Sequence, residues 1–411
     1  MEEIPAEQIR VAAPVNAHSH AFHRILRGRT HAAPAGAAGA GDFWVWREQM
    51  YEAAATLTPE GYEELATAVF AEMVVSGFSA VGEFHYLHHR PDGRPYPDHQ
   101  MERALARAAL TARIRLTLLD TCYLSGGLDQ QGRPLPLNQT QRRFSDGSAE
   151  AWIQRWESLA TALADEDHGT GLVSLGAALH SLRAVPESEL TLLAEWSSTH
   201  PDTPLHVHLS EQPAENSAVQ AAYGASPTEV LHRHGLLGPQ LSAVHATHLS
   251  QTDIELLGSS GTTIVMCPTT EADLADGIGP ARELADAGAT ISLGTDQHAV
   301  VDPYLEMRAL EHGERLRSGT RGRFSPAEIS AAARDGGLRS LGLPPNEDYL
   351  LVSTSSMRTA GSRPDQLPLS ATAQDVEAVV INGAEVARKG RHTRLGDPAE
   401  LYRRFLARHR L

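Results

Sequence analysis

Eight short runs of apolar and β-branched residues recur along the chain, and amphipathic stretches separate most of them. The runs are nearly continuous in apolar residues, which is typical of parallel strands buried on both faces. They cover residues 11–17, 78–84, 114–123, 172–179, 205–209, 241–247, 262–267 and 289–294. Eight strand–helix units predict a (β/α)8 barrel of the TIM type. A doubly wound sheet is the competing architecture, but no Gly-rich phosphate loop follows the first run, where that fold usually has one.

The pattern changes after about residue 345. The segment "VEAVVINGAEVARKG" is typical of a hairpin that turns at Asn-Gly. We therefore expect the barrel over residues 11–344 and a small accessory β-region over 345–395 together with the extreme N-terminus. A C-terminal helix is expected over 396–411. Two further segments read as loops, one flexible and rich in Ala and Gly (31–41) and one long and polar (125–144).

Composition narrows the classes of function. The formal net charge of −16 argues against binding to nucleic acid or to anionic membranes. No apolar run reaches the length of a membrane-spanning helix, and the N-terminus lacks the pattern of a secretory signal. The two cysteines, Cys122 and Cys267, cannot form a disulfide framework and read as small buried apolar residues. A cytoplasmic protein is expected.

Residues with catalytic or metal-binding chemistry fall where the predicted strands end. Active sites of these barrels form at the C-terminal ends of the strands. Among 21 histidines one His-x-His arises readily by chance, so the spread over several strand ends carries the inference. The residues at the ends of the first, fifth, sixth and eighth strands are His18, His20, His208, Glu211, His245 and Asp296.

These residue types suit a hydrolytic metal site. Three imidazoles and a carboxylate bind zinc and leave a position for water, whose pKa the metal brings towards neutrality. A further carboxylate beside the metal, such as Glu211, can carry a proton from water to the leaving group. His245 could stabilise developing negative charge. His206, two residues before His208, is expected to be a hydrogen-bonded core histidine, and His180 is expected to shape the pocket.

Seven motifs together carry a family resemblance. They are "NAHSHAFHR", "FWVWREQMY", "GEFHY", "HSLRAV", "HLSEQ", "CPTTEADLADGI" and "GTDQH". The chain resembles the mononuclear, deaminase-like branch of the amidohydrolase superfamily, and within it the formimidoylglutamate deiminases, over about residues 14–395. The resemblance implies zinc-dependent hydrolysis of N-formimino-L-glutamate to N-formyl-L-glutamate and ammonia, a step of histidine degradation.

The resemblance also assigns roles to residues. It implies one Zn²⁺ per chain, with another divalent ion such as Fe²⁺ as the alternative, held by His18, His20, His208 and Asp296. It implies that Glu211 and His245 are catalytic. We further expect Asp296 to be catalytic, taking up the remaining proton as the tetrahedral intermediate collapses. The substrate carboxylates would be held by Arg47, Tyr86 and Arg183, with a further polar contact at His23. Two departures are visible, since the family usually has Gln at the position of His23 and a longer segment before His18.

Two other functions remain open at this point. A related deaminase of an aromatic base or a triazine would use a stacking pocket and would not need two arginines. A zinc-stabilised barrel without activity would not need Glu211 or His245, because structural zinc sites are closed by protein ligands. A homodimer is also expected, from the edges of the β-region and from the aromatic segment Phe43, Trp44 and Trp46.

Overall fold

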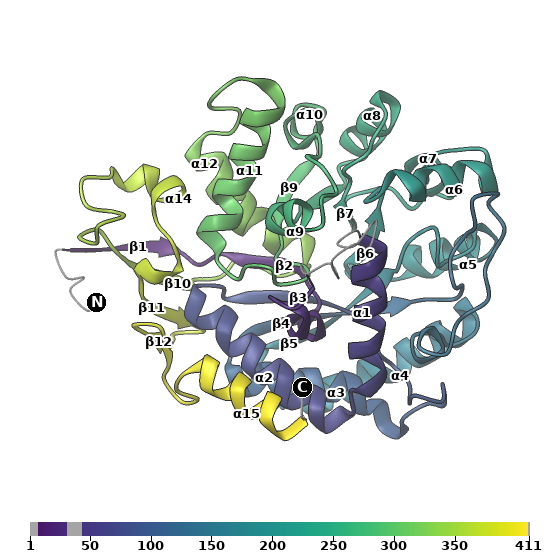
Figure 1. Cartoon of the computed structure of the whole chain (residues 1–411), viewed down its shortest axis with the longest axis horizontal. Coiled ribbons are helices and arrows are strands. Elements are labelled where there is room, and N and C mark those ends of the chain that lie inside the picture. Colours follow the sequence, from purple (N-terminus) through teal and green to yellow (C-terminus); the bar gives the residue numbers. More distant parts are fainter. Residues whose placement is uncertain (1–6, 31–42, 410–411) are drawn as a thin grey trace, which may run out of the picture.

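The eight strands predicted from the sequence form one parallel sheet, in the order β2 to β9, which curls into a barrel (Figure 1). This computed structural model describes residues 7–30 and 43–409, without the side chains of residues 43–45, so the loop predicted over 31–41 lies outside the described residues. The predicted (β/α)8 barrel is confirmed. Its strands are β2 (Val15–Ser19), β3 (Ala80–His85), β4 (Arg115–Cys122), β5 (Val173–Leu179), β6 (Leu205–Leu209), β7 (Leu241–His245), β8 (Thr263–Met266) and β9 (Thr290–Leu293).

The first predicted run, 11–17, belongs to two different sheets. Strand β1 (Gln8–Ala12) ends before Pro14, and β2 begins directly after it. Proline has no N–H to give to a ladder and therefore favours a break between strands. Strand β1 pairs antiparallel with β10, whereas β2 pairs parallel with β3 inside the barrel. The expectation of a single strand over 11–17 is wrong for this reason.

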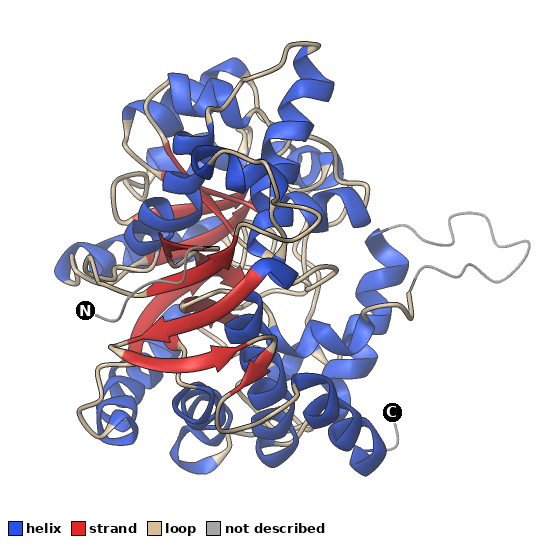
Figure 2. Ribbon diagram, turned by 90° about the vertical axis from the view of Figure 1, so that its left-hand side faces the viewer, coloured by secondary structure: helices blue, strands red, loops and turns tan. Residues whose placement is uncertain are grey.

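Helices surround the barrel (Figure 2). Their ends follow local signals, as α2 shows: Thr58 caps its N-terminus, Pro59 occupies the first turn and Gly77 ends it at φ 112°. The helices are α2 (Pro59–Ser76), α3 (Gln100–Ala112), α4 (Ala149–Asp167), α5 (Glu187–Thr199), α6 (Pro213–Tyr223), α7 (Pro227–Arg233), α8 (Gln251–Ser259), α9 (Pro268–Asp273), α10 (Ala281–Asp286), α11 (Pro303–Ser318), α12 (Pro326–Ala331) and α13 (Gly337–Ser340). No helix among the described residues is both long and apolar enough to span a bilayer.

A second, antiparallel sheet joins the two ends of the chain. Its strand order is β1, β10 (Tyr349–Ser353), β11 (Val376–Ile381), β12 (Ala384–Arg388) and β13 (Arg391–His392). The predicted hairpin at Asn-Gly is confirmed, because Asn382 and Gly383 connect β11 to β12 with φ of 50° and 74°. Two positive φ angles are what a tight hairpin turn requires. The short α14 (Leu367–Ser370) lies between β10 and β11, and α15 (Pro398–His409) follows the sheet and packs against α2.

The two ends of the barrel differ. At the N-terminal end of the strands, α13 closes the interior, and the Ser340 carbonyl oxygen lies 2.8 Å from Nε2 of His206. His206 is therefore the hydrogen-bonded core histidine that was predicted. At the other end, α1 (Phe43–Thr56) lies outside the ring of barrel helices and in front of the strand ends (Figures 1 and 2). Side chains of α1 line a cavity together with strand-end residues, so this helix covers part of the barrel mouth.

Candidate active site and metal centre

Four side-chain atoms converge at the C-terminal end of the barrel. Nε2 of His208 lies 3.2 Å from Nε2 of His18 and 3.3 Å from Nε2 of His20. Oδ1 of Asp296 lies 3.3 Å from Nε2 of His18 and 3.4 Å from Nε2 of His20. Ligand atoms held at about 2.0–2.1 Å around a tetrahedral ion lie about 3.3–3.4 Å apart. These four spacings therefore suit a divalent ion bound by the trio His18, His20 and His208, with Asp296 adjoining His18 and His20.

The hydrogen bonds behind the cluster fix the tautomers that a metal needs. Nδ1 of His20 donates to the Phe84 carbonyl oxygen at 2.8 Å, and Nδ1 of His208 donates to the His180 carbonyl oxygen at 2.9 Å. Because a carbonyl only accepts, each Nδ1 carries the proton and each Nε2 keeps its lone pair for a metal. Burial, together with neighbouring His18, lowers the pKa of His20 to about 3, so the imidazole is neutral. The residues present therefore fit a bound divalent ion.

Strained backbone at the strand ends aims these groups. Asp296 has φ of 42°, and His245, the last residue of β7, has φ of 68°. Ser210, next to Glu211, has φ of 51°. Non-glycine residues seldom occupy the left-handed region, and such positions concentrate at functional sites. These positive φ angles occur where the chain turns at the end of a strand and leaves the barrel.

A carboxylate and a fifth histidine lie beside the four ligand atoms. Nε2 of His245 is 3.7 Å from Oε1 of Glu211 and 4.0 Å from Oδ2 of Asp296. Burial raises the pKa of Glu211, so its protonated form is available near neutrality. Burial disfavours the charge on His245, but the surrounding carboxylates, Glu211 foremost, raise its pKa overall. Glu271, whose Oε1 lies 3.5 Å from Nδ1 of His245, supports the histidine from behind. The arrangement can accept, hold and return protons.

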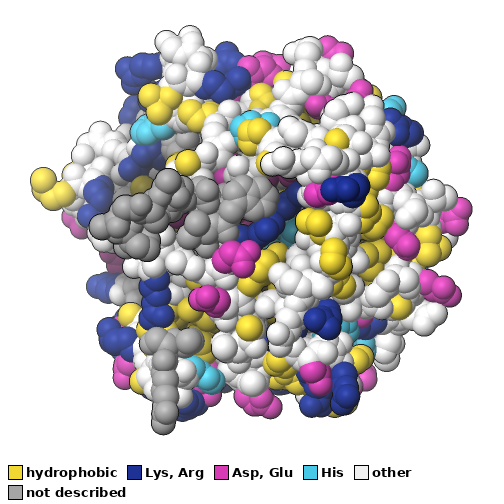
Figure 3. Space-filling model, turned by 45° about the vertical axis from the view of Figure 1, so that its right-hand side comes forward, with side chains coloured by type: hydrophobic (Ala, Val, Ile, Leu, Met, Phe, Trp, Pro, Cys, Tyr) yellow, Lys and Arg dark blue, Asp and Glu magenta, His cyan; other side chains and the backbone are white. Residues whose placement is uncertain are grey.

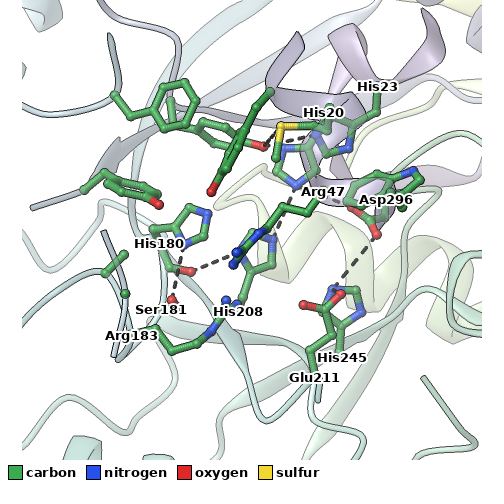
Figure 4. A pocket seen from close by; sticks show the side chains of 18 of the residues that line it. His20, His23, Arg47, His180, Ser181, Arg183, His208, Glu211, His245 and Asp296 are labelled. Carbon is green, nitrogen blue, oxygen red and sulfur yellow. Dashed lines mark hydrogen bonds and ion pairs between the residues drawn. The ribbon is translucent and has the colours of Figure 1, made fainter. Parts of the chain in front are cut away.

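Two arginines reach into the same cavity (Figure 4). Arg183 follows β5, and its Nε lies 3.8 Å from Oε2 of Glu215. Burial disfavours the charge of Arg183, but Glu215 and Glu211 raise its pKa, so the guanidinium stays charged. Arg47 enters from α1 and lines the cavity with Tyr86. The structure thus brings together the residues that the sequence assigned to metal, catalysis and substrate.

His23 meets Tyr86 directly. Nε2 of His23 lies 3.0 Å from the Tyr86 hydroxyl, and both residues are buried and line the cavity. The His23 ring also packs edge-on against Trp46, at 5.0 Å between ring centroids. Trp46 is only 8% exposed, so its ring needs no partner subunit to cover it, and the homodimer stays a prediction. Of the other two aromatic residues in that expectation, Phe43 and Trp44, the side chains lie outside the described residues.

Sequence reasoning missed part of the aromatic wall. Tyr51, Tyr123, Phe144 and Met50 line the cavity, as does His180, which was expected there. Tyr123 is the residue after β4, so the rule that found His245 and Asp296 could also have found it. Tyr51 and Phe144 come from α1 and from the polar loop 125–144, where no strand end marks them.

Fold and site together define a barrel hydrolase of the metal-assisted class. The chain belongs to the amidohydrolase family, whose model matches residues 10–346. It is 35% identical over 398 residues to a formimidoylglutamate deiminase of Pseudomonas aeruginosa, covering 92% of this chain and 84% of that protein. It is 29% identical to an 8-oxoguanine deaminase of the same organism, over 90% of this chain and 80% of that one. A crystal structure of an amidohydrolase from Brucella melitensis superposes with a TM-score of 0.87 at 31% identity, over 98% of this chain and 90% of the other. The resemblance drawn from the motifs is confirmed.

Proposed function

We propose that this amidohydrolase hydrolyses N-formimino-L-glutamate to N-formyl-L-glutamate and ammonia, with one zinc ion per chain held by His18, His20, His208 and Asp296. Another divalent ion such as Fe²⁺ is the alternative. The similarity to the formimidoylglutamate deiminase supports the reaction. The histidine cluster and its neutral imidazoles support the metal. We infer from this reaction a role in histidine degradation, and a cytoplasmic location belongs to the same proposal.

One observation carries the choice of substrate. Arg47 and Arg183 line the same cavity as three residues of the proposed metal site, His20, His208 and Asp296. Side chains of both signs are interspersed on the molecular face in Figure 3, and the chain is acidic overall. A dicarboxylate therefore gains little from long-range attraction and must be recognised by local pairing. Two arginines match two carboxylates because the planar guanidinium pairs bidentately with a carboxylate.

The residues of the chain divide the proton transfers of the reaction. When bound, the divalent ion supplies Lewis-acid activation of a water molecule. Glu211 accepts a proton as the water oxygen adds to the formimino carbon, and it passes that proton to the imino nitrogen. His245, close to Glu211 and Asp296, stabilises the negative charge that develops on oxygen. Arg47, Tyr86 and Arg183 hold the glutamate part still, so that the carbon meets the oxygen in one orientation.

The second half of the reaction needs one more proton. As the carbon–oxygen double bond forms, the hydroxyl proton leaves and the amino group must depart as ammonia. Oδ2 of Asp296 faces His245 and is placed to take up the hydroxyl proton. Returned to the amino nitrogen, which Glu211 has protonated once, this second proton lets the nitrogen leave as ammonia. One water is consumed, and formyl product and ammonia are formed, so atoms and charges balance.

The test is ammonia release from N-formimino-L-glutamate by the purified protein, with metal content measured on the same sample. A panel of cyclic amines, including guanine-type bases and triazines, runs in parallel. The aromatic residues of the cavity and the similarity to 8-oxoguanine deaminase favour this panel as the second candidate. We expect turnover of the dicarboxylate alone. Preference for a cyclic amine would replace the proposal, and a metal-loaded protein without activity on any of them would end it.

A further inference from the structure

A four-residue segment of the polar loop lies behind the cavity wall. It runs from Gln141 to Phe144 at the end of loop 125–144, and its first three residues form a 3₁₀ turn. Three of its side chains are buried, whereas that of Arg142 is exposed. A buried arginine and a buried glutamine in a surface loop are costly unless their polar groups are paired. Their partners show what the segment does.

Arg143 is fully buried, and its guanidinium donates hydrogen bonds to backbone carbonyl oxygens. Its guanidinium donates to Leu57 O at 2.8 Å, to His89 O at 2.9 Å and also to Ala54 O. Ala54 is in the last turn of α1 and Leu57 directly follows the helix. The last carbonyls of a helix have no partner inside it and carry the negative end of its dipole, so a buried cation there caps the helix.

The same arginine joins α1 to the loop after β3. Besides the bond to His89 O, the Arg143 carbonyl accepts from His88 N at 3.1 Å and from His89 N at 2.9 Å. Three segments that are far apart in sequence therefore meet at one residue. Each of them borders the barrel mouth, and α1 carries Arg47 into the cavity.

Gln141 and Phe144 act on the tyrosines of the wall. The Gln141 amide donates to the Tyr123 hydroxyl at 2.8 Å and lies 3.2 Å from that of Tyr51. The Phe144 ring packs against the rings of Tyr86, Tyr123 and Tyr51 at centroid distances of 5.0, 5.3 and 6.1 Å. The tyrosines of the wall are thus held by the Gln141 amide and by the Phe144 ring, which itself lines the cavity.

We propose that Arg143 and Gln141 are positioning residues for substrate recognition, which hold α1 and the tyrosine wall so that Arg47 and Tyr86 meet the substrate carboxylates. This proposal rests on the proposed function. Arg47 and Ala54 are about two turns apart on one helix, some 10 Å along its axis. A helix is stiff over that distance, so a shift at its capped end moves Arg47 as well.

The test replaces Arg143 by lysine, with Arg142→Lys as the matched control one residue away. Lysine keeps the charge but cannot hold three carbonyls with one rigid fork. We expect Arg143→Lys to raise KM for N-formimino-L-glutamate by about 10-fold or more while kcat and zinc content change little, as for a group misplaced by a fraction of an ångström. Arg142→Lys should match the wild type. Gln141→Met, which removes the amide without burying a charge, should raise KM in the same direction.

Two readouts separate positioning from general damage. Hydrogen exchange should accelerate in α1 of Arg143→Lys and stay unchanged in α8, which follows β7, four strands away from β3 in the sheet. In an Arg47→Met background, Arg143→Lys should add little to KM, because its effect acts through Arg47. Unchanged exchange in α1, or a full additional KM effect without Arg47, would overturn the proposal. If the wild type shows no turnover, the proposed function fails, while the exchange comparison still decides whether Arg143 holds α1.

Discussion

His20 and Asp296 follow the first and the last strand of the barrel, and they are joined twice. The backbone N–H of His20 donates to the Asp296 carbonyl at 3.0 Å, and their side chains meet at 3.4 Å between Nε2 and Oδ1. Asp296 N also donates to the His18 carbonyl at 3.0 Å. The backbone bonds that close the barrel therefore also set the spacing of the metal-binding side chains. The same contacts thus close the barrel and order the site.

Gly294 makes this closure possible. A Cβ added there would lie 2.8 Å from Cβ of His18 and 2.9 Å from its backbone N and O. Gly294→Ala should therefore push His18 outward and weaken metal binding by about 10- to 100-fold, the loss typical when the support of a metal ligand is removed. The measurement is zinc affinity by competition with a chelator.

Gly238→Ala is the control for this variant, because a Cβ there meets nothing within 4 Å. It should bind zinc as the wild type does. An alanine at 294 that left zinc affinity unchanged would show that the ligand spacing does not depend on the closure.

Glu211→Gln should keep the metal and lose turnover. The amide preserves the volume but cannot accept a proton, and loss of a general base costs about 10²–10⁴-fold in kcat. Glu255→Gln, at an exposed position of α8, is the control. Zinc content and kcat are measured on the same preparations. Loss of zinc with an unchanged rate per bound ion would make Glu211 a ligand and not a base.

The strand ends could be predicted from the sequence because nearly continuous apolar runs mark the buried strands and amphipathic stretches mark the helices between them. Parallel buried strands are nearly all apolar, so a His or Asp at their end stands out, as at His208, His245 and Asp296. The cavity wall could not be predicted in this way. Tyr51 depends on where α1 crosses the mouth, and Phe144 on how a polar loop folds back, and both are set by tertiary contacts such as those of Arg143. Local pattern carries no record of such contacts.

A single tightly bound ion per chain is expected. Binuclear members of this superfamily commonly bridge two metals with a carboxylated lysine of a barrel strand, and the one lysine here, Lys389, follows β12 in the small sheet. A second buried trio, His85, His88 and Glu102, has spacings that suit a metal. However, Nη1 of Arg155 lies 3.3 Å from Oε1 of Glu102, so a cation of the protein already pairs with that carboxylate. Elemental analysis should give one ion, and two ions that both support turnover would contradict this expectation.

The buried cluster of Arg155, Glu102, His85 and His88 should determine how the free energy of unfolding changes in acid. Burial disfavours the charge of Glu102, but contacts from His85 and His88 and the charge of Arg155 hold its pKa well below the usual range. A carboxylate with a lowered pKa stabilises the fold above its unfolded pKa of about 4.3, and this contribution is lost as the pH falls towards the folded value. His88, whose pKa is raised despite burial, contributes below its unfolded pKa of about 6.5 and loses that contribution as the pH rises.

Glu102→Gln should therefore cost about 3–5 kcal/mol at pH 7, the usual result of removing one partner of a buried ion pair. Between pH 5 and pH 3 the wild type should lose stability more steeply than the variant. Urea unfolding followed by circular dichroism measures both, and the difference between the two proteins cancels the effect of metal release in acid. A constant difference across this range would show that folding does not lower the pKa of Glu102.

Substrate choice depends most directly on Arg183. Removing one partner of a buried, hydrogen-bonded charge pair costs about 2–5 kcal/mol, so Arg183→Met should lower kcat/KM on N-formimino-L-glutamate by roughly 30-fold or more. Zinc content should not change, because Arg183 is not one of the four residues around the cluster. A formamidine without carboxylates gives the arginine nothing to hold, so its slower turnover should hardly respond. Arg233→Met, at an exposed arginine of α7, should leave turnover of both substrates unaffected.

Arg183→Met also leaves Glu215 without its positively charged neighbour at 3.8 Å, and Arg183→Lys restores a positive charge there. If Arg183→Met slowed both substrates equally and Arg183→Lys rescued both, the arginine would serve to neutralise Glu215, and recognition of the dicarboxylate would have to come from Arg47 and Tyr86.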